Sequence, residues 1–246
     1  MRILTSILLC FVSVFIHPNA LANADYAREK KWADEIIPGI VVGDPVYLQL
    51  KQGRTFLTLF TETKEARAAV ILLHGVGVHP DWGLIGVLRT QLADHGYTTL
   101  SLQLPVLPIE ARGNQYRKTY PEGVQRIAAA VDFLQKKGYP KIAIVSHSLG
   151  SAVGALYIRQ QPTKLFAWAA LSIEGADAFS GIKIPVLDLY GENDFPGIVS
   201  SAPARAASLK GKAHSKQVML PKADHFFSQH EQEMMETVKA FLLAVQ

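Results

Sequence analysis

Cysteine is almost absent from the sequence, since Cys10 is the only one among 246 residues. A single cysteine excludes an internal disulfide framework and a cysteine-ligated metal cluster. Dense lysine and arginine clusters are missing too, and the formal net charge is only +4, which argues against nucleic-acid binding. After the first 25 residues no apolar run is long enough to span a bilayer. What remains is an average globular composition with the length of one α/β domain, or at most two small ones.

The first 22 residues have the order of a secretory signal peptide. A positive start at Arg2 precedes an apolar run over residues 3–16, and Ala20-Leu21-Ala22 follows as an A-x-A cleavage site. Cleavage after Ala24 is a close alternative, and an uncleaved anchor is another. We therefore expect residues 1–22 to be a signal peptide and residues 23–246 to be the domain. The expected location is the periplasm of a Gram-negative cell, with secretion beyond it possible.

Alternating apolar segments after residue 40 predict a single α/β domain. Residues 46–50 and 55–60 flank Gln52-Gly53 and indicate an antiparallel hairpin. Short apolar runs predict buried strands at 68–73, 97–102, 141–145, 165–173, 186–190 and 217–220. Helical spacing is found at 84–96, 121–138, 149–161 and 234–245, and residues 23–38 are expected to be a surface lead-in with one or two helical turns. The order predicts a mostly parallel sheet covered by helices on both faces.

The sequence Ser146-His147-Ser148-Leu149-Gly150 joins a predicted buried strand directly to a predicted helix. This resembles the G-x-S-x-G nucleophile elbow of the α/β-hydrolases, with Ser146 in place of the first glycine. The turn is sharp, so the positions two before and two after the nucleophile must be small. We therefore identify Ser148 as the candidate nucleophile; the alternative is an ordinary serine in a tight turn.

A glycine-rich loop follows the strand that ends at Leu73. Its sequence, His74-Gly75-Val76-Gly77, resembles the HG-type loop that supplies an oxyanion-hole N–H in that superfamily. We expect the backbone N–H groups of Val76 and Leu149 to stabilise the charge on a carbonyl oxygen during acyl transfer. His74 is expected to brace the loop.

The superfamily order of nucleophile, acid and base points to two later residues. Asp194 follows the strand ending at Tyr190, where the family acid usually lies, and His225 precedes the C-terminal helix, where the base usually lies. Alternative acids are Glu174 and Asp177, which follow the preceding strand. The remaining acidic and histidine side chains near these positions are expected to be structural or surface residues: Asp188, Asp224, His95, His214 and His230.

More narrowly, the chain resembles a proteobacterial family of exported α/β-hydrolases of unknown function. The resemblance rests on residues 74–82, on Leu102-Gln103-Leu104-Pro105 and on the elbow. It implies the fold, export and a serine triad, but no substrate. Asp81 and Trp82, unusual for hydrolases at large, are interpreted as structural, with Asp81 capping the helix that starts near Leu84 and Trp82 packing on the sheet. The alternative for Trp82 is that it forms a wall of the site.

The predicted function is carboxylic-ester hydrolysis by Ser148, His225 and Asp194 through an acyl-enzyme. No metal or organic cofactor is implied, and the expected partner is a small ester or acyl compound. Residues 174–185 leave no room for a large lid, and the segment 103–120 is the longest candidate for a local cover or a solvated loop with an apolar anchor. Two alternatives remain: an acyltransferase with the same triad, and a non-catalytic hydrolase-fold protein that binds an envelope component or a protein partner.

Overall fold

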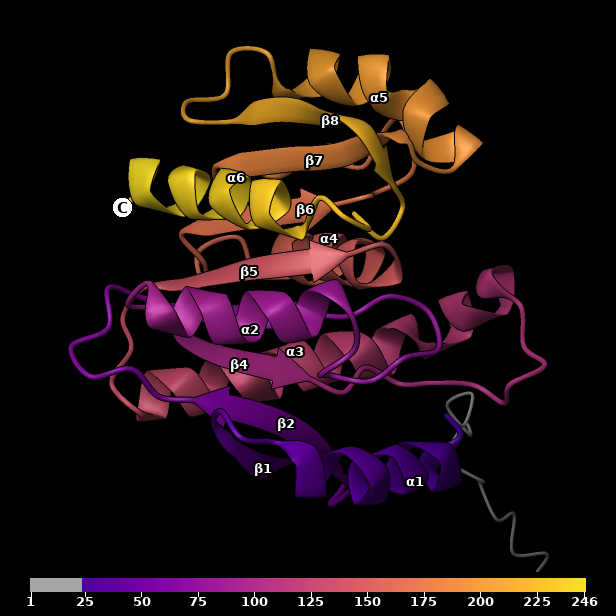
Figure 1. Cartoon of the computed structure of the whole chain (residues 1–246), viewed down its shortest axis with the longest axis vertical. Coiled ribbons are helices and arrows are strands. Elements are labelled where there is room, and N and C mark those ends of the chain that lie inside the picture. Colours follow the sequence, from indigo (N-terminus) through magenta and orange to yellow (C-terminus); the bar gives the residue numbers. More distant parts are fainter. Residues whose placement is uncertain (1–23) are drawn as a thin grey trace, which may run out of the picture.

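The computed structural model describes residues 24–246, so the predicted signal peptide lies outside the described part of the chain. An eight-stranded sheet has the order β1-β2-β4-β3-β5-β6-β7-β8, and Figure 1 shows it running from the indigo amino-terminal edge to the yellow carboxyl-terminal edge. The strands are β1 (Asp44–Gln49), β2 (Thr55–Thr61), β3 (Ala69–Leu73), β4 (Thr98–Leu102), β5 (Ile142–His147), β6 (Ala167–Leu171), β7 (Val186–Asn193) and β8 (Lys216–Asp224).

The pairing confirms the predicted hairpin and parallel sheet. β1 and β2 pair antiparallel, and β2 also pairs antiparallel with β4. From β4 to β8 every neighbouring pair is parallel. β3 to β6 are buried along their whole length, because helices cover both faces, and this explains their continuous apolar sequences.

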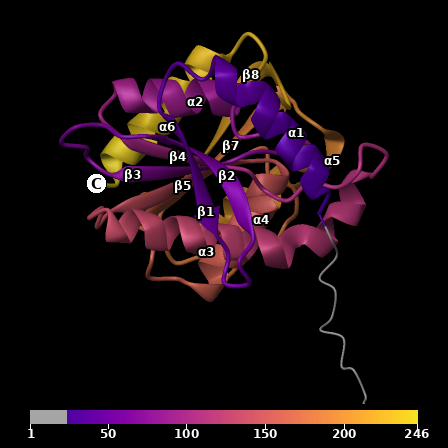
Figure 2. The same ribbon diagram turned by 90° about the horizontal axis from the view of Figure 1, so that it is seen from below.

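Within residues 24–246, six α-helices surround the sheet, together with two short 3-10 helices, η1 (Ile37–Gly39) and η2 (Gly113–Thr119). They are α1 (Tyr26–Ile36), α2 (Leu84–Asp94), α3 (Tyr120–Lys136), α4 (Leu149–Gln160), α5 (Pro196–Leu209) and α6 (Glu231–Ala244). In the view along the sheet, α1, α2 and α6 lie on one side while α3 and α4 lie on the other (Figure 2). None of these helices is long and apolar enough to cross a membrane.

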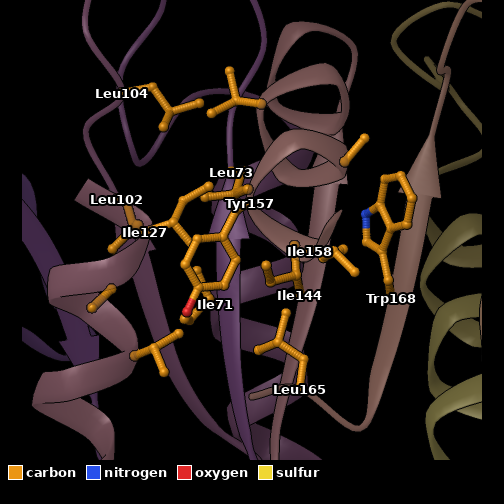
Figure 3. Packing of buried hydrophobic residues seen from close by; sticks show 14 of the residues in the cluster. Ile71, Leu73, Leu102, Leu104, Ile127, Ile144, Tyr157, Ile158, Leu165 and Trp168 are labelled. Atoms are coloured by element: carbon orange, nitrogen blue, oxygen red, sulfur yellow. The ribbon is translucent and has the colours of Figure 1, made fainter. Parts of the chain in front are cut away.

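Two hydrophobic clusters, one on each face, hold the helices to the sheet. The cluster beneath α3 and α4 includes Ile71, Leu73 and Ile144 of the sheet and Tyr157 and Ile158 of α4 (Figure 3). The opposite cluster joins the other sheet face to α2 and α6. Alternate residues of the buried strands supply the two clusters, as the two-residue side-chain period of a strand requires.

Two elements differ from the sequence-based expectation. The lead-in predicted as one or two turns is an 11-residue helix, α1, with Glu29 and Ala33 buried. Helix α5 was not predicted, because Pro203 interrupts its pattern and its apolar face is narrow; only Ile198, Ala202, Arg205 and Leu209 are buried. It packs on the ends of β7 and β8, next to the loop that carries Asp194.

The two segments considered as covers differ in character. The chain between β6 and β7 contains no helix or strand, in agreement with the prediction that no large lid is inserted there. In the segment 103–120, Leu104, Val106 and Leu107 are buried in the core, while the basic side chains after them are exposed. This segment therefore has an apolar anchor and continues into the 3-10 helix η2, while Ile109 of its apolar part is 76% exposed.

Candidate active site

Ser148 lies on the sharp turn between β5 and α4, with φ +53° and ψ −118°. That backbone conformation is rare for residues other than glycine, and such strain is typical of functional turns. The helix begins tightly against β3: a Cβ atom at Gly150 would lie 2.6 Å from the carbonyl oxygens of Leu73 and His74. Only glycine fits at position 150, which gives a steric reason for the last residue of the elbow motif.

The departure from the motif at Ser146 is accommodated by hydrogen bonds. Its side chain is fully buried, and its Oγ lies 3.0 Å from the Oγ of Ser151. The indole Nε1–H of Trp168 donates to Ser146 Oγ at 2.8 Å. A serine is therefore tolerated here because its hydroxyl group is fully partnered inside the core.

Ser148, His225 and Asp194 are brought together in one hydrogen-bonded row. The Oγ of Ser148 lies 3.1 Å from Nε2 of His225, and Nδ1 of His225 lies 2.6 Å from Oδ1 of Asp194. Asp194 accepts only, so the imidazole carries its proton on Nδ1 and offers Nε2 to the serine hydroxyl. This is the arrangement in which an imidazole can take the proton of an attacking serine.

Asp194 is held ionised by three donors. Besides His225, the hydroxyl of Ser172 donates to Oδ2 at 2.5 Å and the backbone N–H of Phe195 donates to Oδ1 at 2.7 Å. Burial by itself would raise the pKa of Asp194, but the hydrogen bonds from His225, Ser172 and Phe195 outweigh it and lower the pKa below its ordinary value. The carboxyl group of Asp194 is therefore ionised and can balance the positive charge of a protonated His225.

His147, the residue before the candidate nucleophile, contacts the candidate base His225 through its backbone and its ring. Its Nε2–H donates to the backbone carbonyl of His225 at 2.9 Å, and the two ring centroids are 4.8 Å apart. Burial, followed by the charge of a protonated His225, lowers the pKa of His147 to about 4. His147 is thus neutral and fixes the backbone that carries His225.

The predicted oxyanion loop lies directly against the elbow. A Cβ atom at Gly75 would be 3.1 Å from Nδ1 of His147 and 3.5 Å from Cβ of Ser148, so only glycine allows this approach without displacement. Leu149 is the first residue of α4, where a backbone N–H has no acceptor within the helix. Val76 follows Gly75 in the chain and is partly exposed.

His74 braces this loop, as the sequence indicated. Its ring is fully buried; Nδ1–H donates to the carbonyl of Gly75 at 2.8 Å, and Nε2 accepts the backbone N–H of Leu104 at 2.9 Å. Burial lowers the pKa of His74 to about 3, so the ring stays neutral. A neutral imidazole with one donor and one acceptor ties the loop after β3 to the segment after β4.

The alternative residues lie elsewhere. Neither Glu174 nor Asp177 hydrogen-bonds to His225, and Asp224 instead accepts the backbone N–H groups of Phe226 and Ser228 at 2.9 Å each. Asp188 is fully buried and pairs with Arg205 at 2.9 Å, which is a structural role.

The expected cap on α2 is wrong. The residue before that helix is Gly83, and Asp81 pairs with the buried Arg89 at 2.6 Å instead. Sequence reasoning also missed three neighbours of Asp194 and His225: Ser172, Phe195 and Phe226. The one available signal was for Ser172, a polar residue directly after a buried strand. Phe195 and Phe226 adjoin Asp194 and His225 in the sequence, but nothing in it indicated which rings would touch.

Comparison with solved structures places this architecture in a known class. Est1E from Butyrivibrio proteoclasticus superimposes with a TM-score of 0.69 at 18% identity, over 81% of this chain and 98% of that one. Dienelactone hydrolase from Anabaena variabilis gives 0.71 at 17%, over 82% and 96%. An α/β serine hydrolase without lid from Xanthomonas campestris gives 0.68 at 12%, over 83% and 95%. The chain therefore has the α/β-hydrolase fold.

Family comparison is less specific. Residues 46–121 match the family described as "Protein of unknown function (DUF3530)", which covers the hairpin, β3, the oxyanion loop, α2 and β4 but not the elbow. No curated protein sequence matches the chain. The comparisons thus establish the fold, and the chemistry must be argued from the site.

Proposed function

We propose that this protein is a serine hydrolase that cleaves carboxylic esters through an acyl-enzyme formed on Ser148. The observation that carries the proposal is the row from Ser148 through His225 to Asp194, with distances of 3.1 and 2.6 Å. Serine is a weak nucleophile unless a base takes its proton, and this row supplies a base with an orienting carboxylate. The strained turn at Ser148 and the three donors on Asp194 support the same interpretation.

The proposed reaction uses groups of this chain only. Ser148 Oγ attacks the ester carbonyl while His225 Nε2 takes its proton; the backbone N–H groups of Val76 and Leu149 stabilise the resulting oxyanion. His225 then returns the proton to the departing alkoxide, which leaves as an alcohol. Water, deprotonated by the same imidazole, attacks the acyl-enzyme. The bond from the acyl carbon to Ser148 Oγ then breaks, the imidazolium returns its proton to Oγ, and the carboxylic acid is released. Asp194 stabilises the imidazolium in both the acylation and the deacylation step.

The names of two solved structures with this fold support an ester as the substrate. Dienelactone hydrolase, one of the structures with this fold, is named for a lactone, which is a cyclic ester. A solved structure of Est1E contains ferulic acid, a carboxylic acid of the kind that ester hydrolysis releases. We further propose that the reaction takes place outside the cytoplasm, on the basis of the signal peptide that the sequence predicts for residues 1–22.

Labelling with a fluorophosphonate probe tests the proposal, because such probes modify only an activated serine. We expect the wild-type protein to be labelled, and also the control Ser200→Ala, which removes an exposed serine. Ser148→Ala should be unlabelled, and His225→Ala should be labelled far more slowly. Hydrolysis of a simple acetate ester should fall about 10⁴-fold or more in Ser148→Ala. A folded wild-type protein that resists the probe would favour the non-catalytic binding protein. Faster turnover with added alcohols, and formation of new esters, would favour the acyltransferase.

A further inference from the structure

Exposed aromatic side chains surround the candidate general base. Phe195 is 55% exposed and Phe226 is 42% exposed, and Trp82 is partly exposed beside them. We refer to Phe195, Phe226 and Trp82 as the aromatic rim. Large apolar side chains that gather on a surface commonly mark a binding site, and these three come from three separate loops.

The rim is centred on His225. The ring of Phe195 stacks on the imidazole with centroids 4.0 Å apart and planes inclined by 20°. Phe226 meets the same imidazole edge-on at 5.0 Å, and Trp82 meets Phe226 at 5.5 Å. A contiguous aromatic surface therefore extends outward from the imidazole along both sides.

The backbone holds the two phenylalanines in place. Phe195 N–H donates to Asp194, and Phe226 N–H donates to Asp224 at 2.9 Å. Each ring is thus attached to an anchored turn, although neither is buried in the core. Rigid, exposed aromatic rings of this kind provide binding area at low conformational-entropy cost.

The geometry of the proposed reaction decides which part of the substrate meets the rim. The carbonyl carbon bonds to Ser148, and its oxygen must lie at the N–H groups of Val76 and Leu149. The leaving oxygen must accept a proton from Nε2 of His225. The alcohol part of the ester therefore lies beside the imidazole, where the aromatic rim is located, and the acyl chain leaves in another direction.

We propose that the aromatic rim is the alcohol-binding subsite and that the substrates are esters of apolar, preferentially aromatic, alcohols. This inference rests on the proposed ester hydrolysis. Aromatic groups of the alcohol would stack on Phe195 or contact the edges of Phe226 and Trp82. Small polar alcohols gain none of these contacts.

Two acetate esters of primary alcohols test the inference: benzyl acetate and 2-methoxyethyl acetate. Both give the same acetyl-enzyme, so the steps after loss of the alcohol are identical and the ratio of their kcat/KM values reports the alcohol part alone. We expect the wild-type protein to prefer benzyl acetate by about tenfold or more, and Phe195→Ser and Phe226→Ser each to reduce that ratio several-fold. Phe195→Leu, which keeps an apolar surface, should retain part of the preference.

Two controls separate specificity from general damage. A series of methyl esters with acetyl, butyryl and octanoyl groups should keep its order in all variants, even where Phe195→Ser lowers every rate by disturbing His225. Val41→Ser removes a 93% exposed apolar residue before β1, at the end of the sheet away from the elbow. It should change neither the kcat/KM ratio of the two acetates nor the order of the methyl esters.

The outcomes are distinguishable. If the probe labels Ser148 and acetates are hydrolysed, but the alcohol preference is absent or unchanged in the rim variants, the subsite is wrong and the proposed function stands. If rim variants lose activity only toward esters dispersed in phosphatidylcholine vesicles, the rim is a lipid-contact surface, which also overturns the inference. If the folded protein is not labelled at all, the proposed function itself fails.

Discussion

At the scale of single residues, Ser146 shows how a change in a motif is compensated locally. The hydroxyl at this position accepts the indole N–H of Trp168 inside a fully buried strand pair. A glycine at position 146 would satisfy the elbow equally well but would leave that N–H without its partner. The serine therefore serves the core, and the elbow only requires that it be small.

We predict that Ser146→Gly destabilises the protein without abolishing the chemistry. An unpartnered buried N–H costs about 1–3 kcal/mol, so the urea midpoint should fall while fluorophosphonate labelling of Ser148 persists. Trp168→Phe opens a cavity of its own, so the double variant should lose less stability than the sum of the two single losses. A midpoint equal to wild type in Ser146→Gly would show that the hydrogen bond is energetically neutral.

The residues of the site differ in how far the sequence predicts them. Ser148 and Gly150 can be predicted from a local pattern, because a strand, a turn and a helix follow one another within a few residues. Asp194 and His225 required the chain order of a known superfamily. The stacking of Phe195 on His225 and the bond from Ser172 to Asp194 join loops 30 and 22 residues apart in the chain, and no local pattern reports such contacts.

At the scale of elements, α1 is held by a buried ionic cluster in addition to the apolar contacts of Trp32, Ala33 and Ile36. Arg126 of α3 is fully buried and binds Glu29 of α1 at 2.9 Å and Glu122 of its own helix at 2.6 Å. Tyr26 of α1 donates to Glu122 at 2.9 Å. Charged residues normally indicate a solvated surface, which is why the sequence predicted a lead-in of one or two turns here.

Removing the arginine should therefore loosen α1. In Arg126→Met two buried carboxylates lose their counter-charge, and breaking a buried ion pair in this way costs about 3–5 kcal/mol. Burial already raises the pKa of Glu29, an effect that Arg126 opposes. Relative to the wild-type protein, the variant should consequently regain stability as the pH is lowered toward 5, because its unpaired carboxylates take up protons.

Urea unfolding at pH 7.5 and pH 5.5 measures this effect. Lys30→Ala, which breaks an exposed pair with Asp34 on the same helix, is the control and should leave the midpoint in place. An Arg126→Met protein whose loss of stability is equal at both pH values would contradict the electrostatic explanation and indicate lost packing alone.

Helix α5 was not predicted because its local sequence argues against a helix. Its sequence has Pro203 inside the helix and few apolar positions, so local preference argues against it. The helix forms because Arg205 reaches the buried Asp188 of β7, and Ile198 and Ala202 pack on Tyr190. Tertiary contacts that the sequence does not display thus override propensity.

At the scale of the whole molecule, buried neutral histidines couple the fold to pH. In the unfolded chain the imidazoles of His74 and His147 take up protons near pH 6.5, whereas in the folded chain burial lowers their pKa values to about 3 and about 4. Between these limits the unfolded state binds more protons, so the free energy of unfolding decreases as the pH falls. Asp194, with a lowered pKa, adds to this loss only below about pH 4.

We predict a loss of about 1.4 kcal/mol per pH unit for each of the two histidines below pH 6. Urea unfolding between pH 7.5 and pH 4.5 measures the slope. His147→Gln should be less stable at pH 7.5 but should show about half the wild-type slope, while His214→Gln controls for the loss of an exposed histidine. A wild-type protein of constant stability over this range would contradict the assignment of neutral buried rings.

The three triad residues lie on loops after β5, β7 and β8, and this order has a consequence for biosynthesis. The turn that carries Ser148 is made first, whereas His225 arrives with one of the last loops of the chain, where it contacts Asp194 through Nδ1 and His147 through its carbonyl. A partly synthesised or C-terminally shortened chain therefore carries Ser148 without an activating partner. Under the proposed mechanism, reactivity is a property of the finished polypeptide, so the serine stays inert during translation and during any passage across a membrane in the unfolded state.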